Sequence, residues 1–424
     1  MAGLKKAGSN WVDGDRFFDR EAELEVLGAR VQNGTHTLLT AQRRMGKTSL
    51  VRELLRRLAA EGHFETVFVD LEDANTAADA VVEIGVESRH VHGAWDRIRS
   101  GFANVLRGVE DRIDELAVAE VRVKLRAGID PGNWRQKGDA VCAALAKNER
   151  PVVLALDELP ILVNRMLKDH DYRITPAGKR DVDEFLSWLR KIGQDHRDRL
   201  CLILSGSIGL EPILHQAGLS AHANIFSPLD LKPWSEKTAL DCLAALAETC
   251  GLDLPLATGK EMCRRLRCLV PHHVQRFFDS LDEDLRMAGW RQASLEDVGR
   301  VYTREMLSVR GQADLDHYES RLKLVLGPDG YRAALALLTE AAVQGGVLQR
   351  AALDLYREHF QGWAVADHPV PIDDVLRVLE HDGYLEPWED GDYRFVSGLL
   401  EEWWRARHGR HFVPIARRAG SKGV

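Results

Sequence analysis

The chain has 424 residues, of which 45% are hydrophobic and 29% are charged, and its formal net charge is -8. This length predicts two or three domains with enough apolar sequence to build buried cores. The composition is ordinary for a soluble globular protein. The acidic balance argues against a nonspecific nucleic-acid binder, although it leaves room for a local basic patch.

Two features of the sequence bear on its location. The N-terminus "MAGLKKAGSNWVDGD" lacks the apolar segment of a signal peptide, and the chain has no apolar run of about 18 residues that would span a membrane. The six cysteines lie in apolar or helical sequence and form no CxxC pair. We therefore expect a cytoplasmic protein with reduced, mostly buried thiols.

Five short β-rich runs alternate with helical segments in the first half of the chain. These runs span residues 35–41, 65–73, 150–160, 199–207 and 224–231. The alternation predicts a parallel five-stranded sheet of the α/β class, with helices on both faces. The third run is almost unbroken apolar sequence, which is typical of a central strand. The polar stretch 74–150 is expected to be a mostly helical insertion.

The pattern becomes all-helical after "KPWS". Residues 232–325 predict a helical lid in which Pro271 ends one helix and begins another. Residues 326–410 predict three helices followed by a hairpin that turns at "EDGD", which is the element order of a winged helix. We expect an N-terminal arm at 1–16, and a basic, frayed tail at 411–424.

The stretch "TLLTAQRRMGKTSL" predicts a phosphate-binding loop between a strand and a helix. Lys47 would neutralise the β- and γ-phosphates, the Thr48 hydroxyl would bind Mg²⁺, and Gly46 would let the backbone approach the phosphates closely. Ala41 stands where the pattern usually has its first glycine, and it requires a negative φ at that point. The residues expected to line the nucleotide here are Ala41, Arg44, Met45, Gly46, Lys47, Thr48 and Ser49.

An acidic pair follows the third strand in "VVLALDEL". Asp157 would hold Mg²⁺ through water, and Glu158 would act as general base on the attacking water. Both lie at the carboxyl end of a strand, where open α/β sheets bind their ligands. The fourth strand ends in "SGS", so Ser205 and Ser207 are either sensors of the γ-phosphate or ordinary turn serines.

Several further residues could have either a functional or a purely structural role. The two arginines inside the loop either contact phosphates or a neighbouring subunit, or are solvated. Arg197 and Arg199 precede the fourth strand, either as an arginine finger acting on another subunit or as surface charge. Pro271 and His272 either face the nucleotide or only break the helix. The segment "CRRLRCLVPHH" contains two cysteines and two histidines, but their spacing is not typical of a zinc site.

Seven segments in this order resemble a known family. They are "FFDREAELEVL", "AQRRMGKTSLV", "VFVDLED", "LALDELPILV", "LILSGSIGLEPIL", "LVPHHVQRFF" and "DLDHYESRL". Together with the winged-helix pattern, they are similar to the archaeal-type ATPases of the STAND group of AAA+-related P-loop NTPases, many of which are bacterial. The resemblance covers nearly the whole chain.

The resemblance implies an ATPase core at 17–231 with an extra strand between the loop strand and the acidic strand. It also implies a lid and a winged helix that move with nucleotide state. By position, it implies Arg20 and Glu21 near the adenine, Lys47 and Thr48 at phosphate and Mg²⁺, Asp157 and Glu158 at the catalytic water, and Ser207 as sensor. Members typically act as ATP-driven switches, often in signalling or conflict systems, and commonly assemble when ATP is bound.

Three functions follow as hypotheses, and the third of them is a nucleotide-binding scaffold with little turnover. The first is a slow Mg²⁺-dependent ATPase that reports its nucleotide state to a partner protein. The second is a DNA-binding ATPase resembling origin-recognition proteins, which needs a basic recognition helix. The third helix of the winged segment is instead acidic, with Asp373, Asp374, Glu380 and Asp382 against Arg377. The arginines that would compensate are Arg405, Arg407, Arg410, Arg417 and Arg418.

Overall fold

The computed structural model describes residues 3–8, 11–104, 106, 115–224, 226–307, 309–361 and 371–419. Its internal contacts divide the chain into two compact units. The sheet unit comprises Arg20–Thr40 and Lys47–Leu231. The helical unit comprises Met1–Asp19, Ala41–Gly46 and Lys232–Val424.

The sheet unit is built on five parallel strands in the order β2-β3-β4-β1-β5. The strands are β1 Thr37–Thr40, β2 Glu65–Asp70, β3 Val152–Asp157, β4 Leu200–Ser205 and β5 Ser227–Asp230. Every residue of β3 and β4 is buried, as expected for central strands with apolar sequences. The predicted fold class is confirmed, and β4 lies between the loop strand β1 and the acidic strand β3.

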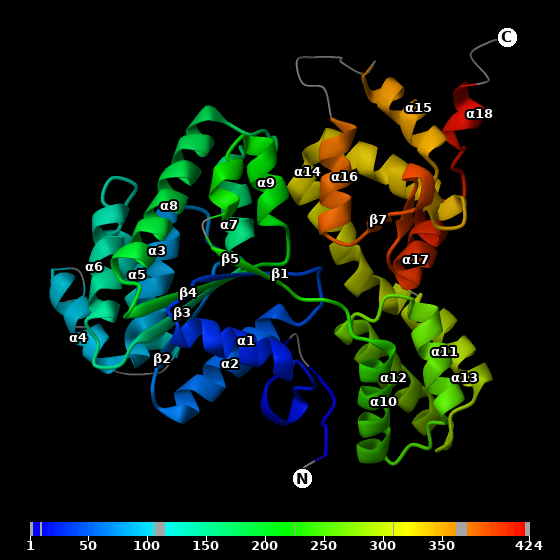
Figure 1. Ribbon diagram of the computed structural model, residues 1–424, viewed down its shortest axis with the longest axis horizontal. Helices are drawn as coiled ribbons and strands as arrows, with labels where there is room; N and C mark the ends of the chain where they lie inside the picture. The colour runs from blue at the N-terminus through cyan, green and yellow to red at the C-terminus, as the bar shows by residue number, and fades with distance from the viewer. Residues whose placement is uncertain are drawn as a thin grey trace. The chain divides into compact units, whose positions relative to one another are not determined.

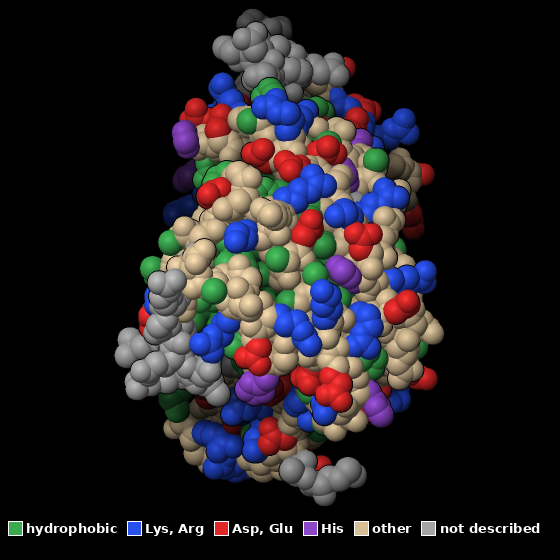
Figure 2. All heavy atoms as spheres, turned by 90° about the vertical axis from the view of Figure 1, so that its left-hand side faces the viewer, with side chains coloured by type: hydrophobic (Ala, Val, Ile, Leu, Met, Phe, Trp, Pro, Cys, Tyr) green, Lys and Arg blue, Asp and Glu red, His purple; other side chains and the backbone are tan. Residues whose placement is uncertain are grey.

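Helices cover both faces of this sheet, with α1 and α2 on one face and α7, α8 and α9 on the other (Figure 1). Their bounds are α1 Glu21–Gln32, α2 Lys47–Glu61, α7 Leu159–Leu167, α8 Pro176–Asp195 and α9 Leu210–Ala217. The segment predicted to be a mostly helical insertion contains α3 Ala77–Glu87, α4 His92–Gly101, α5 Glu115–Gly128 and α6 Trp134–Ala146. On the face shown in Figure 2, basic and acidic side chains are interspersed, as on an ordinary solvated surface.

The helical unit continues after the last strand with a bundle of helices. These are α10 Glu236–Cys250, α11 Leu256–Leu266, α12 Pro271–Met287 and α13 Leu295–Val301. Pro271 is the first residue of α12, where its missing N–H has no helical partner to lose, so the predicted break is confirmed. The next helix, α14 Val309–Val343, is interrupted at Gly327, whose φ of 67° and ψ of -177° are available only to glycine.

The last part of the chain alternates helices with three short strands. The elements after α14 are β6 Val347–Leu348, α15 Arg350–Gln361, α16 Ile372–His381, β7 Leu385–Pro387, β8 Tyr393–Phe395, α17 Gly398–His408 and α18 Ile415–Ala419. The strands form an antiparallel sheet in the order β6-β8-β7. β7 and β8 are the predicted hairpin, and its turn carries the sequence "EDGD".

The prediction that the C-terminal tail is frayed is wrong for residues 415–419. Residues 415–419 form α18, where Ile415 is buried and its backbone N–H donates to the buried carboxylate of Glu340 at 2.9 Å. The charge of Glu340 at the N-terminus of α18 and the buried Ile415 side chain hold this segment in place. Residues 420–424 lie outside the described part of the chain.

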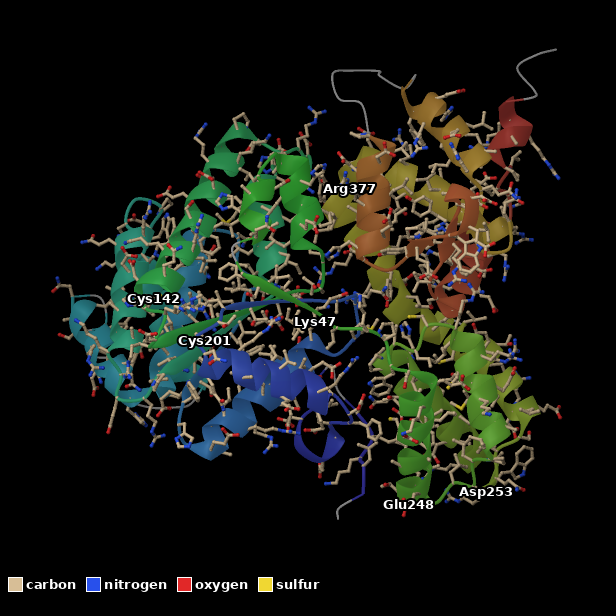
Figure 3. The ribbon with its side chains drawn as sticks, in the orientation of Figure 1. Lys47, Cys142, Cys201, Glu248, Asp253 and Arg377 are labelled. Carbon is tan, nitrogen blue, oxygen red and sulfur yellow. The ribbon has the colours of Figure 1, made fainter. Side chains whose placement is uncertain are left out.

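Two predictions about composition can be compared with the structure. No helix among the described residues is long and apolar enough to cross a membrane. The six cysteines are all free, and only Cys250 is partly exposed. Burial raises the pKa of Cys142 and Cys201 to about 12, so these two thiols stay protonated and behave as apolar core groups (Figure 3).

Candidate functional site

The loop between β1 and α2 has the backbone conformation that its sequence predicts. Gly46 has a φ of 88°, which favours glycine, and a Cβ added there would meet no atom within 4 Å. Glycine is therefore favoured at position 46 by its backbone conformation and not by a lack of space for a side chain. Arg44 also has a positive φ, of 65°, whereas Ala41 does not, so the alanine fits the end of the strand.

Lys47 begins α2 and is only 7% exposed (Figure 3). Its neighbour Thr48 donates its hydroxyl to Oδ2 of Asp157 at 2.7 Å. This contact joins the start of α2 to the carboxyl end of β3, two elements separated by about a hundred residues of sequence. A hydroxyl and a carboxylate oxygen side by side are the hard oxygen donors that Mg²⁺ prefers.

The two acidic residues at the carboxyl end of β3 are each held by a serine from the end of β4. Ser205 donates its hydroxyl to Oδ1 of Asp157 at 2.6 Å. Ser207 donates both its backbone N–H and its hydroxyl to Oε2 of Glu158, each at 2.9 Å. Both serines are therefore in the acidic site, and the two residues are bonded to different carboxylates.

Glu158 adopts an uncommon backbone conformation. Its φ is 58° and its ψ 25°, in the left-handed region that glutamate rarely occupies, and its N–H donates to Oδ1 of Asp157 at 3.1 Å. This turn ends the strand sharply and starts α7 at Leu159. Non-glycine residues in this region are concentrated at functional sites, where the surrounding structure enforces them.

Gly206 separates the two serines and has no room for a side chain. A Cβ added there would lie 2.3 Å from Cδ of Pro160 in the first turn of α7. We expect Gly206→Ala to destabilise the protein by about 1–3 kcal/mol, because backbone or ring must move. Chemical denaturation measures this, and Gly28→Ala is the control. Gly28 lies in α1 with no atom within 4 Å of an added Cβ, so that change should be neutral or stabilise by about 0.5–1 kcal/mol. Equal free energies of unfolding for the two variants would contradict the close contact between Gly206 and Pro160.

Arg20 and Glu21 lie at the start of α1. Arg20 is buried, with a φ of 72°, and its Nη1 donates to Oε1 of Glu23 at 2.8 Å. Glu21 accepts two hydrogen bonds from Arg57 of α2, which lower the pKa of its carboxyl. The structure thus gives both residues structural partners in the sheet unit; a place near the adenine stays a prediction.

Within the helical unit, loop residue Arg44 belongs to a half-buried cluster of basic side chains with two residues of α12. Burial and then the charge of Arg44 lower the pKa of His272 to about 3, so this imidazole is neutral at physiological pH. Burial and Arg44 also lower the pKa of Arg276. Sequence reasoning missed Arg276. The available signal was its position one helical turn after His272, on the same face of α12.

Arg199, one of the two arginines that the sequence offers as a finger, has structural partners. Its guanidinium donates to the backbone carbonyl oxygens of Ala146, Asn148 and Glu149 at and just after the end of α6, with distances of 3.2 Å to Ala146 and 2.9 Å to Glu149. It precedes β4, at the edge opposite to the acidic site, so its guanidinium is committed to structure. In the part of the chain that the structure describes, no group of three or more histidine, cysteine, aspartate or glutamate side chains could hold a metal ion.

Comparison with known proteins agrees with this arrangement. Residues 30–214 match a family model described as an AAA domain. The Walker-type ATPase PABY2304 of Pyrococcus abyssi is similar in structure, with a TM-score of 0.56, 16% identity, and coverage of 94% of this chain and 98% of that chain. The ORC2 protein of Aeropyrum pernix has a TM-score of 0.52 and 13% identity, covering 93% of this chain and 98% of that chain. No curated protein matches the sequence. The fold is that of the P-loop NTPases of AAA type.

Proposed function

We propose that this protein binds ATP with Mg²⁺, hydrolyses it slowly, and uses the nucleotide state as a switch toward a partner protein. The observation that carries the proposal is the contact between Thr48 and Asp157, with Glu158 beside them. A phosphate loop and an acidic strand end meet there in the arrangement that nucleotide hydrolysis requires. The match of residues 30–214 to an AAA domain supports the same conclusion.

The roles of the site residues follow from their chemistry. Lys47 and the backbone N–H groups at the start of α2 would bind the phosphates, and Thr48 and Asp157 would hold the metal. When bound, Mg²⁺ neutralises charge on the phosphate oxygens. Glu158 accepts a proton from the attacking water, and the two donors from Ser207 fix the direction of its carboxylate. Through this contact Ser207 acts as sensor.

The cluster of Arg44, His272 and Arg276 supports the switch. Burial lowers the pKa of both arginines, which marks the cost of placing these charges out of water. An anion in contact with the cluster would offset that cost. We therefore assign Pro271, His272 and Arg276 of the lid to the nucleotide-bound state, with the lid at 232–325 and a winged helix at 326–410. STAND-type assembly into oligomers in the ATP-bound state belongs to this proposal.

Binding of a fluorescent ATP analogue to the full-length protein tests the proposal. We expect saturable binding with Mg²⁺ and much weaker binding in EDTA, because Thr48 and Asp157 would hold a metal ion that offsets the charge of the phosphates. Steady-state release of phosphate then measures turnover. Absence of nucleotide binding in the presence of Mg²⁺ would overturn the proposal.

A DNA-binding ATPase is the second candidate, favoured by the structural similarity to the ORC2 protein. The charges of the C-terminal segment argue against it. Arg357 pairs with Asp373 of α16 at 2.8 Å, and Arg405 and Arg407 of α17 pair with the acidic residues Glu401, Asp316 and Glu319. These cations are thus partly neutralised. Salt-dependent binding of duplex DNA at physiological ionic strength would favour this second function.

A further inference from the structure

A groove of about 1000 Å³ lies entirely within the helical unit. It is lined by the start of α10, by α11 and the residues that follow it, and by the hairpin β7–β8. We call it the α11 groove. Its volume is that of a site for a ligand or a short peptide segment. It contains none of the residues assigned to nucleotide.

The floor of the α11 groove is apolar. Trp234, Cys263, Cys268 and Leu269 are buried and line it, together with Val396 from the end of the hairpin. Burial raises the pKa of Cys263 to about 11 and of Cys268 to about 12, so neither thiol carries charge at physiological pH. An apolar side chain of an incoming segment would be removed from water here.

The polar groups left over in the groove are mostly donors. Trp234 is 6% exposed, and its indole Nε1–H has no hydrogen-bond partner among the described residues. Lys260 is exposed on α11 and forms no ion pair or hydrogen bond within the same residues. Arg264 uses Nε and Nη2 for Glu261 and retains Nη1. The side chains of Lys260 and Arg264 carry only donors, so the groove is suited to a ligand that supplies oxygen acceptors.

The negative charges of the acidic residues in the groove are already balanced by arginines or by a helix N-terminus. Glu261 accepts from both Arg264 and Arg265. Glu386 accepts from Arg394 at 2.5 Å across the hairpin. Glu236 lies in the first turn of α10, where the helix dipole stabilises a negative charge. The charges in the groove that are left to interact with a ligand are therefore positive, and they favour a negatively charged ligand.

Arg267 connects the groove to the rest of the unit and has a strained backbone. Its φ of 61° and ψ of -59° lie outside the regions that non-glycine residues ordinarily adopt. Its guanidinium donates to the carbonyl oxygen of Phe395 at 3.2 Å and to Oε2 of Glu401 at 2.9 Å. These bonds tie the end of α11 to the hairpin and to α17. Such outliers persist where the surrounding structure enforces them and are concentrated at ligand clamps and switches.

We propose that the α11 groove binds an acidic peptide segment of a partner protein that also carries an apolar side chain. The apolar side chain lies on the floor beside Trp234, and the carboxylates accept hydrogen bonds from Lys260 and Arg264. A carboxylate that reaches Arg267 competes with Glu401 and loosens the tie between α11 and α17. Only this link to the switch rests on the proposed function; the binding itself does not.

Fluorescence anisotropy with the full-length protein tests this inference. The probe is a short fluorescein-labelled peptide with two leucines flanked by aspartates, and its control has lysines in place of the aspartates. We expect the aspartate peptide to bind at least about tenfold more tightly. Lys260→Glu and Arg264→Glu should each weaken its binding by about tenfold, because each reverses a charge in the groove.

The matched control is Arg291→Glu, which reverses an exposed charge in the same bundle outside the groove and should leave binding within about twofold of wild type. Thermal melts confirm that the variants are folded. Lys47→Ala should bind the peptide like wild type, which separates this site from nucleotide binding. Equal affinity for the two peptides, or charge reversals at Lys260 and Arg264 without effect, would overturn the inference.

Discussion

Glu158→Gln should lower the steady-state rate of ATP hydrolysis by about a hundredfold or more while leaving ATP affinity almost unchanged. The carboxylate of Glu158 lies at the turn directly after Asp157, and it is fixed by two donors from Ser207. The amide has nearly the same shape and still accepts those bonds, but it cannot take a proton from water. Loss of a general base typically costs about 10²–10⁴ in rate.

Phosphate release and binding of a fluorescent ATP analogue, measured on the same preparations, separate turnover from affinity. Glu211→Gln is the control, since it removes an exposed carboxylate on α9 shortly after the serines and should leave the rate unchanged. Identical rates for wild type and Glu158→Gln would refute the assignment of Glu158 as general base and leave only a nucleotide-binding scaffold.

Lys47→Ala should abolish nucleotide binding in the concentration range where wild type saturates. Lys47 is buried at the start of α2, where a phosphate group bound at the helix N-terminus would lie against its charge. Removing one member of a buried charge pair costs about 2–5 kcal/mol, which is a loss of roughly thirtyfold or more in affinity. The melting temperature should then no longer rise with ATP.

Differential scanning fluorimetry with and without Mg²⁺-ATP measures this loss. Lys191→Ala removes an exposed lysine of α8 and is the matched control, which should keep the full ATP-induced shift. The Lys47→Ala protein itself should remain folded, because the change removes a buried charge. A preserved shift in this variant would show that the loop is not the phosphate site.

The strands were predictable because each is a short apolar run between helical patterns, and a parallel sheet requires such runs. The proximity of Thr48 and Asp157 was also predictable, because the loop after β1 and the last residue of β3 lie at the carboxyl edge of one parallel sheet. The order of strands was not contained in hydrophobic periodicity. The position of β4 between β1 and β3 came only from the resemblance to a known family.

Other parts of the site depend on side-chain contacts that periodicity does not report. The pattern "SGS" gave two equivalent serines, and only three-dimensional packing assigns Ser205 to Asp157 and Ser207 to Glu158. Arg276 was not recognised, because an arginine on an amphipathic helix is usually solvated. The basic tail was predicted to fray on the basis of its charges, yet a single buried glutamate, Glu340, anchors it.

The position of β4 has a mechanical consequence. The loop strand β1 and the acidic strand β3 are not neighbours in the sheet, because β4 lies between them and is hydrogen-bonded to both. At its carboxyl end, the chain holds Asp157 and Glu158 through its serines. Just before its amino end, Arg199 donates hydrogen bonds to the backbone carbonyl oxygens of Ala146 and Glu149, at and after the end of α6. A shift of β4 along its axis would therefore move its serines and Arg199 together. Such a shift would couple the position of Asp157 and Glu158 to the end of α6.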